Sequence, residues 1–117
     1  MQRKLNALTV LEEHPELWSP QIVGEVNDYD VKVSNVAGDY DRHAHDDTDE
    51  IFIVLSGRLQ LVLADETITL EPLDVYTVPA GIEHQPRAEE GTRVMFIEPR
   101  GTTQDGTLTG NIGNRIS

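Results

Sequence analysis

The chain lacks cysteine, and it has few positive charges and no long apolar run. Without cysteine it has no disulfide framework and no thiol chemistry. None of its apolar runs approaches the roughly 20 residues that a membrane-spanning helix requires. Two positive charges near the N-terminus precede a short apolar stretch that soon becomes acidic, so we predict no signal peptide. We therefore expect a cytoplasmic protein.

Positive charge is scarce, because 9 Lys and Arg residues stand against 21 Asp and Glu residues and give a net charge of −12. A surface of this sign repels nucleic acids and anionic membranes, since both carry dense negative charge. We therefore expect no nucleic acid and no membrane among the partners of this protein.

Short segments rich in aliphatic residues recur between turn residues along the middle of the chain. They span residues 21–26, 29–37, 50–55, 58–63, 67–70, 75–78 and 92–98, and residues 38–45 extend the second of them. Short strands at regular spacing, divided by turns, predict an all-β fold, either a barrel or a jelly roll.

The 117 residues suit a single domain with one core. We predict an N-terminal arm over residues 1–20 that packs on a barrel formed by residues 21–99. Residues 100–117 contain four glycines and few apolar side chains, which predicts an extended tail. This tail is either disordered or lies across the barrel mouth or a partner subunit.

The arm is expected to contain one short helix. Leu5, Leu8 and Leu11 recur at a helical spacing, and a His-Pro pair at 14–15 ends the pattern. We interpret the histidine of that pair as a capping or surface residue outside any site. We expect Trp18, the single tryptophan, to pack the arm onto the barrel rather than to contact a ligand.

Residues 50–55 are apolar at nearly every position. A strand with two apolar faces is buried on both sides. If Glu50 points into the barrel, Phe52 and Val54 do so too, and the opposite face needs a cover. That outer face consists of Ile51, Ile53 and Leu55. The cover is a second sheet or a second subunit, and we predict a homodimer.

The residues that could bind a metal ion are concentrated in two short segments. His43 and His45 are two positions apart, which places both imidazoles on one face of a strand. Four polar residues suited to a turn follow, and Glu50 then opens the next strand. A second segment, residues 79–84, begins with a Pro-x-Gly turn and ends in His84. We predict that this turn brings His84 to the first three side chains.

A His-x-His pair alone is common on polar surfaces, but here three of the four histidines fall in these two segments. Three imidazoles and one carboxylate suit Fe, Mn, Ni, Cu or Zn, and suit Mg or Ca less, because these prefer all-oxygen shells. Four protein ligands leave an octahedral metal with two open positions, as a catalytic metal requires. We predict one divalent transition metal ion, bound by His43, His45, Glu50 and His84.

Aspartates surround the first of these segments. They are Asp39, Asp41, Asp46, Asp47 and Asp49. One interpretation is a solvated turn. The other is a negatively charged mouth that favours cations and disfavours anionic substrates.

The two segments resemble the two sequence motifs of the cupin superfamily. The matching residues are His43, His45, Glu50 and Gly57 in the first motif and Pro79, Gly81 and His84 in the second. Leu73 and Ala88 stand where the family usually has glycine and asparagine. The short spacer between the motifs is similar to that of small single-domain bacterial cupins.

The resemblance, over residues 20–99, implies an all-β cupin fold, which is a double-stranded β-helix or jelly-roll barrel, here with a short N-terminal helix or arm. It also implies a metal inside the barrel and a small molecule as ligand or substrate, reached through one mouth.

The reaction stays open, because the superfamily includes enzymes and non-enzymatic binders. One hypothesis is an enzyme, either of the dioxygenase type or of the type that isomerises sugars or keto acids. Its candidate acid–base groups are Tyr40 and Tyr76, and its candidate substrate-binding groups are Arg42, Arg58 and Gln60. For these five the competing interpretations are packing and surface ion pairs. The alternatives to an enzyme are a non-catalytic, metal-dependent small-molecule binding protein and a barrel that the metal only stabilises.

Overall fold

The computed structural model describes residues 3–116. Its elements are α1 (Ala7–Glu13), β1 (Gln21–Val26), β2 (Tyr29–Asp39), β3 (Glu50–Ser56), β4 (Leu59–Val62), β5 (Thr67–Leu70), β6 (Val75–Val78), β7 (Gln85–Pro99) and β8 (Asn114–Arg115). The predicted all-β fold is confirmed. No helix within the described range is long and apolar enough to span a membrane.

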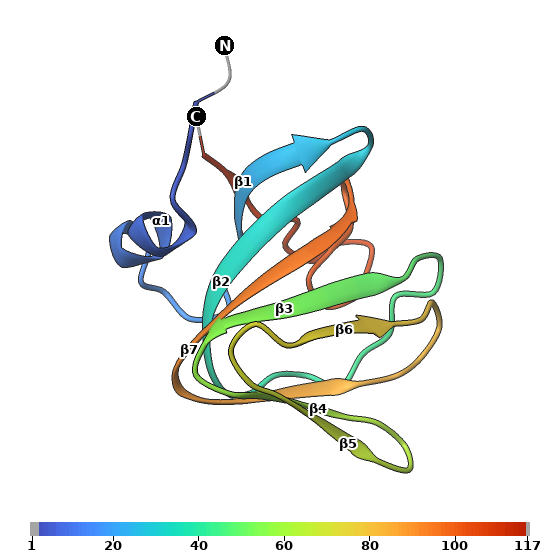
Figure 1. Cartoon of the computed structure of the whole chain (residues 1–117). Coiled ribbons are helices and arrows are strands. Elements are labelled where there is room, and N and C mark those ends of the chain that lie inside the picture. The colour runs from blue at the N-terminus through green and yellow to red at the C-terminus, as the bar shows by residue number, and fades with distance from the viewer. Residues whose placement is uncertain (1–2, 117) are drawn as a thin grey trace.

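The strands form one sheet that curls around a core without closing on itself (Figure 1). Its main path is β5-β4-β7-β2-β1-β8, and β3 pairs with β6 and β7. β7 joins the two halves of the sheet, because residues 85–88 pair with β4 whereas residues 93–97 pair with both β2 and β3. The predicted strand at residues 92–98 was therefore too short. Residues 85–91 contain a proline and a glycine, which favour loops, but cross-strand pairing overrides this local preference.

The two faces of β3 are divided as predicted. Glu50, Phe52 and Val54 are buried and point into the barrel. Ile51, Ile53 and Leu55, on the outer face, are half-buried. β7 alternates in the same way, with Val94 and Phe96 buried in the core beside Phe52. This inward-facing layer forms the wall against which the candidate site is built.

Helix α1 lies on the outer surface of the sheet (Figure 1). It begins after Asn6, whose side-chain oxygen accepts hydrogen bonds from the first turn, and ends at the capping residue His14. Val10 and Leu11 pack against Val33 of β2. The predicted spacing of leucines was wrong in one respect, because Leu8 is 41% exposed. The buried stripe instead follows positions 7, 10 and 11, which share one side of a helix.

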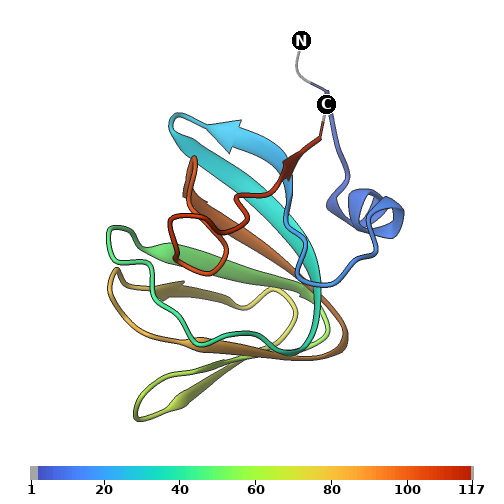
Figure 2. The same ribbon diagram turned by 180° about the vertical axis from the view of Figure 1, so that it is seen from behind.

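The segment after β7 is packed against the barrel. Seen from behind, it runs across the molecule before β8 pairs in parallel with β1 (Figure 2). On the way its backbone touches the loop that carries the histidines, since a β-carbon at Gly106 would collide with the carbonyl oxygen of Ala44. Arg115 then donates to both carboxylate oxygens of the buried Asp30, at 3.1 and 3.2 Å. These contacts fix the tail beside the barrel.

Candidate metal centre

Backbone hydrogen bonds join the two histidine-bearing segments. His43 and His84 form an isolated antiparallel bridge, in which each N–H donates to the carbonyl oxygen of the other, at 3.0 and 2.8 Å. The Gly81 N–H donates to His45 O at 2.9 Å, and the Ala80 N–H donates to Asp49 Oδ1 at 2.9 Å. The Pro-x-Gly turn is thereby held against the first segment.

The expectation that residues 38–45 continue a strand was wrong. β2 ends at Asp39, and in the loop that follows the structure assigns a β-bridge at His43 but no continuous strand. The loop turns away because residues 39–49 are mostly charged or polar and offer few apolar side chains for the core.

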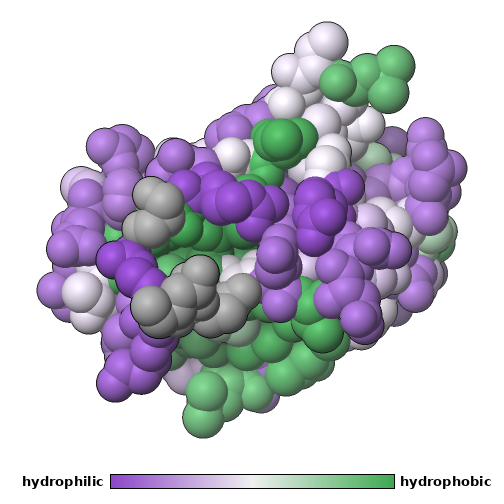
Figure 3. Space-filling model, turned by 90° about the horizontal axis from the view of Figure 1, so that it is seen from above, coloured by the Kyte–Doolittle hydropathy of each residue, from purple (hydrophilic) through white to green (hydrophobic). Residues whose placement is uncertain are grey.

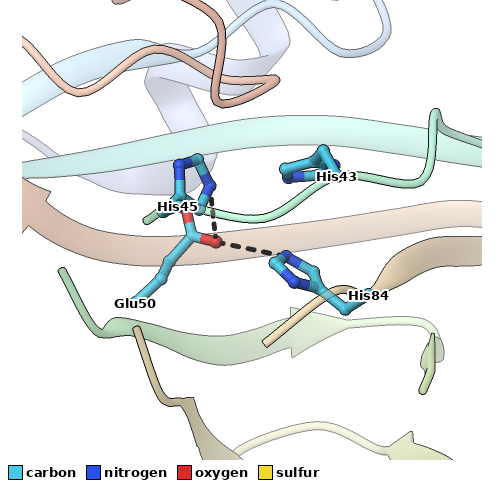
Figure 4. Close-up of side chains that lie close together, drawn as sticks. All are labelled: His43, His45, Glu50 and His84. Carbon is cyan, nitrogen blue, oxygen red and sulfur yellow. Dashed lines mark ion pairs between the residues drawn. The ribbon is translucent and has the colours of Figure 1, made fainter. Parts of the chain in front are cut away.

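Four side chains converge inside the barrel, as Figure 4 shows. His43, His45, Glu50 and His84 each offer a ligand atom, and all four atoms lie within 4.8 Å of one another. Glu50 Oε1 is 3.3 Å from His45 Nε2 and 3.6 Å from His84 Nε2. His45, Glu50 and His84 are buried, whereas His43 is half-buried. The sequence thus identified the four side chains that the fold brings together.

The hydrogen bonding of these groups fits a metal ion. The Nδ1 atoms of His43 and His84 donate to the carbonyl oxygens of Asp41 and Ile82, at 2.8 and 3.0 Å, which leaves each Nε2 unprotonated. Three buried ligand atoms have no hydrogen-bond partner among the described residues. They are His45 Nε2, Glu50 Oε1 and His84 Nε2. Buried polar atoms rarely remain unpaired, and a cation bound between them accounts for all three.

The protonation states also fit. Burial lowers the pKa of His43, and its neighbours His84 and His45 act in the same direction. Burial alone would raise the pKa of Glu50, but its contacts with His45, His84 and Glu98 outweigh that effect and hold it below its usual range. At neutral pH the site therefore presents a neutral imidazole at His43 and a charged carboxylate, the forms that bind metal.

A second buried polar group lies next to Glu50, and sequence reasoning missed it. Lys32 Nζ donates to Glu98 Oε1 at 2.8 Å and to the carbonyl oxygen of Thr102 at 3.0 Å. Burial and the neighbouring Glu50 raise the pKa of Glu98 to about 9, although Lys32 opposes the shift. The alternation of side chains along β2 could have predicted that Lys32 is buried, because it places Lys32 on the same face as Ser34, which is also buried.

The metal-ligand cluster borders an apolar cavity. This space is partly open to solvent, and the empty volume of about 410 Å³ between its walls includes some of that solvent. Its lining residues are Trp18, Ser34, Val36, Tyr40, His43, Glu50, Phe52, Leu59, Pro86, Val94, Phe96 and Gln104. No described lining residue is a lysine or an arginine. Such a cavity accepts a small, largely apolar molecule and presents two of the four ligand residues to it.

A second and more open hollow is lined in part by His45. Its wall also includes Asp46, Asp47 and Arg100 together with several residues of the C-terminal segment. Two of the five aspartates thus line an opening next to the cluster. Asp39 and Asp49 are otherwise engaged, the first with Arg87 at 3.0 Å and the second with the Pro-x-Gly turn.

Tyr40 is the one sequence-predicted acid–base candidate that lines the cavity. Its ring stacks at 4.9 Å on Trp18 and meets His43 edge-on at 5.6 Å, both measured between ring centroids. Burial, with Asp105 and Asp41 nearby, raises the pKa of Tyr40 to about 12. The phenol is therefore neutral at pH 7, a form that can donate a hydrogen bond but does not act as a general base. Tyr76 packs against the core on β6 and does not line the cavity.

The other candidates lie away from the cavity. Arg42 pairs with Glu83 at 2.7 Å, and Arg58 pairs with Glu71 at 3.0 Å. The Gln60 amide contacts a neighbouring threonine hydroxyl at 3.5 Å. Among the lining residues that carry a polar side-chain atom, sequence reasoning missed Trp18, Ser34 and Gln104. Ser34 was on a predicted strand face, but nothing in the sequence pointed to Gln104, because its position depends on the path of the tail.

The cupin domain family matches residues 32–98. This chain is a cupin. It is 35% identical over 99 residues to the uncharacterized protein YdbB of Bacillus subtilis, with 84% of this chain and 88% of the relative covered. The crystal structure of a cupin-2 domain containing protein from Shewanella frigidimarina is similar at 42% identity and a TM-score of 0.80, covering 82% of this chain and 94% of the other.

A more distant solved structure is similar in fold. Hydroquinone 1,2-dioxygenase from Sphingomonas sp. TTNP3 shares 19% identity and a TM-score of 0.74, over 92% of this chain and 33% of the other. At this identity the likeness concerns the fold alone.

Proposed function

We propose that this cupin is a metal-dependent enzyme of the dioxygenase type that acts on a neutral small molecule with an aromatic body and two adjacent oxygens. The observation that supports it most directly is the position of the unpartnered ligand atoms beside an apolar cavity. A closed structural metal site has no need of such a space.

The lining argues for this ligand class over the sugars and keto acids that were also considered. Sugars require many polar partners, and keto acids require a cation for their carboxylate. The described lining residues supply no lysine or arginine, and most of them are aliphatic or aromatic. Trp18, Phe52 and Phe96 offer flat apolar surfaces to a ring.

The roles of the residues follow from their positions. His43, His45, Glu50 and His84 would hold the metal. A bound transition metal supplies a Lewis acid for ligand oxygens, and iron adds oxygen chemistry. Tyr40, as a neutral phenol, donates a hydrogen bond into the cavity, and the aromatic side chains exclude water from it.

Elemental analysis of protein purified without added metal tests the metal centre. We expect about one transition metal per chain, and its loss in the His43→Ala/His45→Ala variant. Oxygen uptake by iron-loaded protein with a panel of catechols then tests turnover. Metal binding without uptake across the panel would favour the alternative, a non-catalytic, metal-dependent binding protein. Absence of metal even after reloading would contradict both.

We also propose that the protein is a homodimer formed through the outer face of β3 and β6. Ile51 and Ile53 are only half-buried, and Val75 on the edge strand β6 is 56% exposed. The view from above shows that apolar side chains also reach the molecular surface, beside a larger polar area (Figure 3). A second copy over the outer face of β3 and β6 removes Ile51, Ile53 and Val75 from water. A monomeric mass by light scattering would contradict this proposal.

A further inference from the structure

The C-terminal segment, residues 100–108, carries one side chain to the cavity. Gln104 lines the same space as His43 and Glu50, although it lies more than fifty positions after both in sequence. Its backbone N–H donates to the carbonyl oxygen of Asn111 at 2.7 Å, which fixes the loop at this position. The Gln104 amide has no hydrogen-bond partner among the described residues. A free amide is thus held at the edge of an apolar space.

The segment is anchored to the metal site on two sides. Lys32, which also pairs with Glu98, donates to the carbonyl oxygen of Thr102 at 3.0 Å. At the other end, Gly106 has a φ of +78° and packs so closely on Ala44 O that no β-carbon fits. Ala44 lies between His43 and His45, so the segment rests on the loop that presents two of the four metal-ligand residues.

We propose that Gln104 is a ligand-contacting residue of the cavity and that its amide hydrogen-bonds the ligand while the metal centre holds the ligand's oxygens. The inference rests on the proposed function and adds a specificity determinant to it. An amide both donates and accepts, and it carries no charge, so it matches a neutral polar substituent such as a hydroxyl, carbonyl or nitro group on an aromatic ring. The C-terminal segment is thereby part of the site rather than an appendage to the barrel.

Binding of 4-nitrocatechol to zinc-loaded protein tests this proposal, because zinc allows binding without oxidation and the absorbance of the probe reports its contact with metal. The test variant is Gln104→Leu, which keeps the size of the side chain and removes the amide. The matched control is Gln60→Leu, since Gln60 is a glutamine on β4 that does not line the cavity. Zinc affinity, measured separately, shows whether each variant keeps an intact metal centre.

We expect Gln104→Leu to weaken 4-nitrocatechol binding about tenfold, the loss typical of one hydrogen bond to a ligand, with unchanged zinc affinity. Gln60→Leu should bind like the parent protein. Equal binding by the parent and Gln104→Leu would overturn the role of Gln104 and leave the proposed function standing. No binding by the parent would overturn the proposed ligand class and, with it, the assignment of Gln104.

A second variant displaces the segment without touching Gln104. Gly106→Ala places a methyl group against Ala44 O, so the segment must shift. We expect this variant to weaken 4-nitrocatechol binding as well. Gln104→Leu/Gly106→Ala should bind no more weakly than Gln104→Leu alone, because both changes act through one contact. Additive losses in the double variant would show that Gly106 acts independently of Gln104 and would contradict the proposal.

Discussion

Glu50 and Glu98 lie side by side in the barrel, yet the structure gives them opposite tasks. Both side chains are buried, and each shifts the pKa of the other. Glu50 faces two histidine nitrogens, and its pKa is held below the usual range. Glu98 faces Lys32, but burial and the charge of Glu50 raise its pKa to about 9. The neighbours of a buried carboxyl, rather than its residue type, decide whether it is a metal ligand or a neutral acid.

The unpartnered oxygens agree with this difference. As acceptors, Glu50 Oε1 and Glu98 Oε2 both lack a hydrogen-bond donor within residues 3–116. A proton on Glu98 Oε2 lets Glu98 donate to the Glu50 carboxylate, which satisfies one of the two oxygens. Glu50 Oε1 still points at the histidines and needs a cation. The pair therefore consists of one charged ligand and one hydrogen-bond donor behind it.

The largest expected difference between the two glutamates is in metal affinity. Glu50→Gln should weaken zinc binding by more than about 100-fold, because it removes a charged ligand, whereas second-layer changes cost 10–100-fold. Glu98→Gln should lower affinity less than about tenfold, since the new amide also donates to Glu50. Competition with a chelating dye measures both. Equal losses in the two variants would show that Glu98 is itself a ligand.

Acid should release the metal through the histidines and not through either glutamate. Metal-binding imidazoles must be neutral, so we expect loss of metal below about pH 5. Burial lowers the pKa of His43, and the pKa of Glu50 is also low, so both keep their metal-binding forms well below neutral pH. Glu98→Gln should leave the midpoint of release unchanged. Metal retained far below pH 5 would contradict a site built on three histidines.

The convergence of the four candidate metal ligands was predictable from the sequence because each lies in a short pattern. His43 and His45 are two apart, and His84 follows a Pro-x-Gly turn that the structure holds by hydrogen bonds to the first segment. The backbone keeps the expected conformation even at Leu73, which stands where the family usually has glycine. Leu73 has a φ of +71°, the left-handed backbone that glycine adopts most easily. The conformation of a turn depends on a few neighbouring residues, so it can be predicted from a short stretch of sequence.

The lining of the cavity was less predictable, because it depends on contacts between distant parts of the chain. Gln104 reaches the cavity through the path of the tail, and Trp18 reaches it through the arm, where its indole donates to Ala37 O at 3.0 Å. The Lys32–Glu98 pair joins strands 66 positions apart in sequence. Arg42 and Arg58 were predicted to bind a substrate, but they form ion pairs with surface carboxylates instead. Charge alone does not tell which way a side chain points.

Removing Lys32, the partner of Glu98, should affect the stability of the protein more than its metal binding. Lys32→Met removes two hydrogen bonds made by a buried ammonium group and leaves Glu98 without its partner. We expect a loss of about 3 kcal/mol in the free energy of unfolding, measured by urea titration of metal-free protein. Lys32→Met/Glu98→Leu should recover much of it, because an apolar pair avoids burying polar groups. A single variant as stable as the parent would mean that the hydrogen bonds of Lys32 contribute nothing to stability.

The smallest expected effect is the pH dependence of stability that comes from the proton on Glu98. Since its folded pKa of about 9 lies above the ordinary value, the folded state holds a proton that the unfolded state releases as the pH rises above about 4.5. Stability of the metal-free protein therefore falls as pH increases towards 9, by up to about 1.4 kcal/mol per pH unit from this group.

The effect of pH on stability through Glu50 has the opposite sign, because its lowered pKa makes stability fall only when the pH drops below the ordinary glutamate range. Urea unfolding at pH 6 and pH 8 should show a loss of about 2 kcal/mol in the parent that is absent in Glu98→Gln, which mimics the protonated acid at both pH values. The same loss in both proteins would show that Glu98 is ionised beside Lys32, and the contrast between the two glutamates would then disappear.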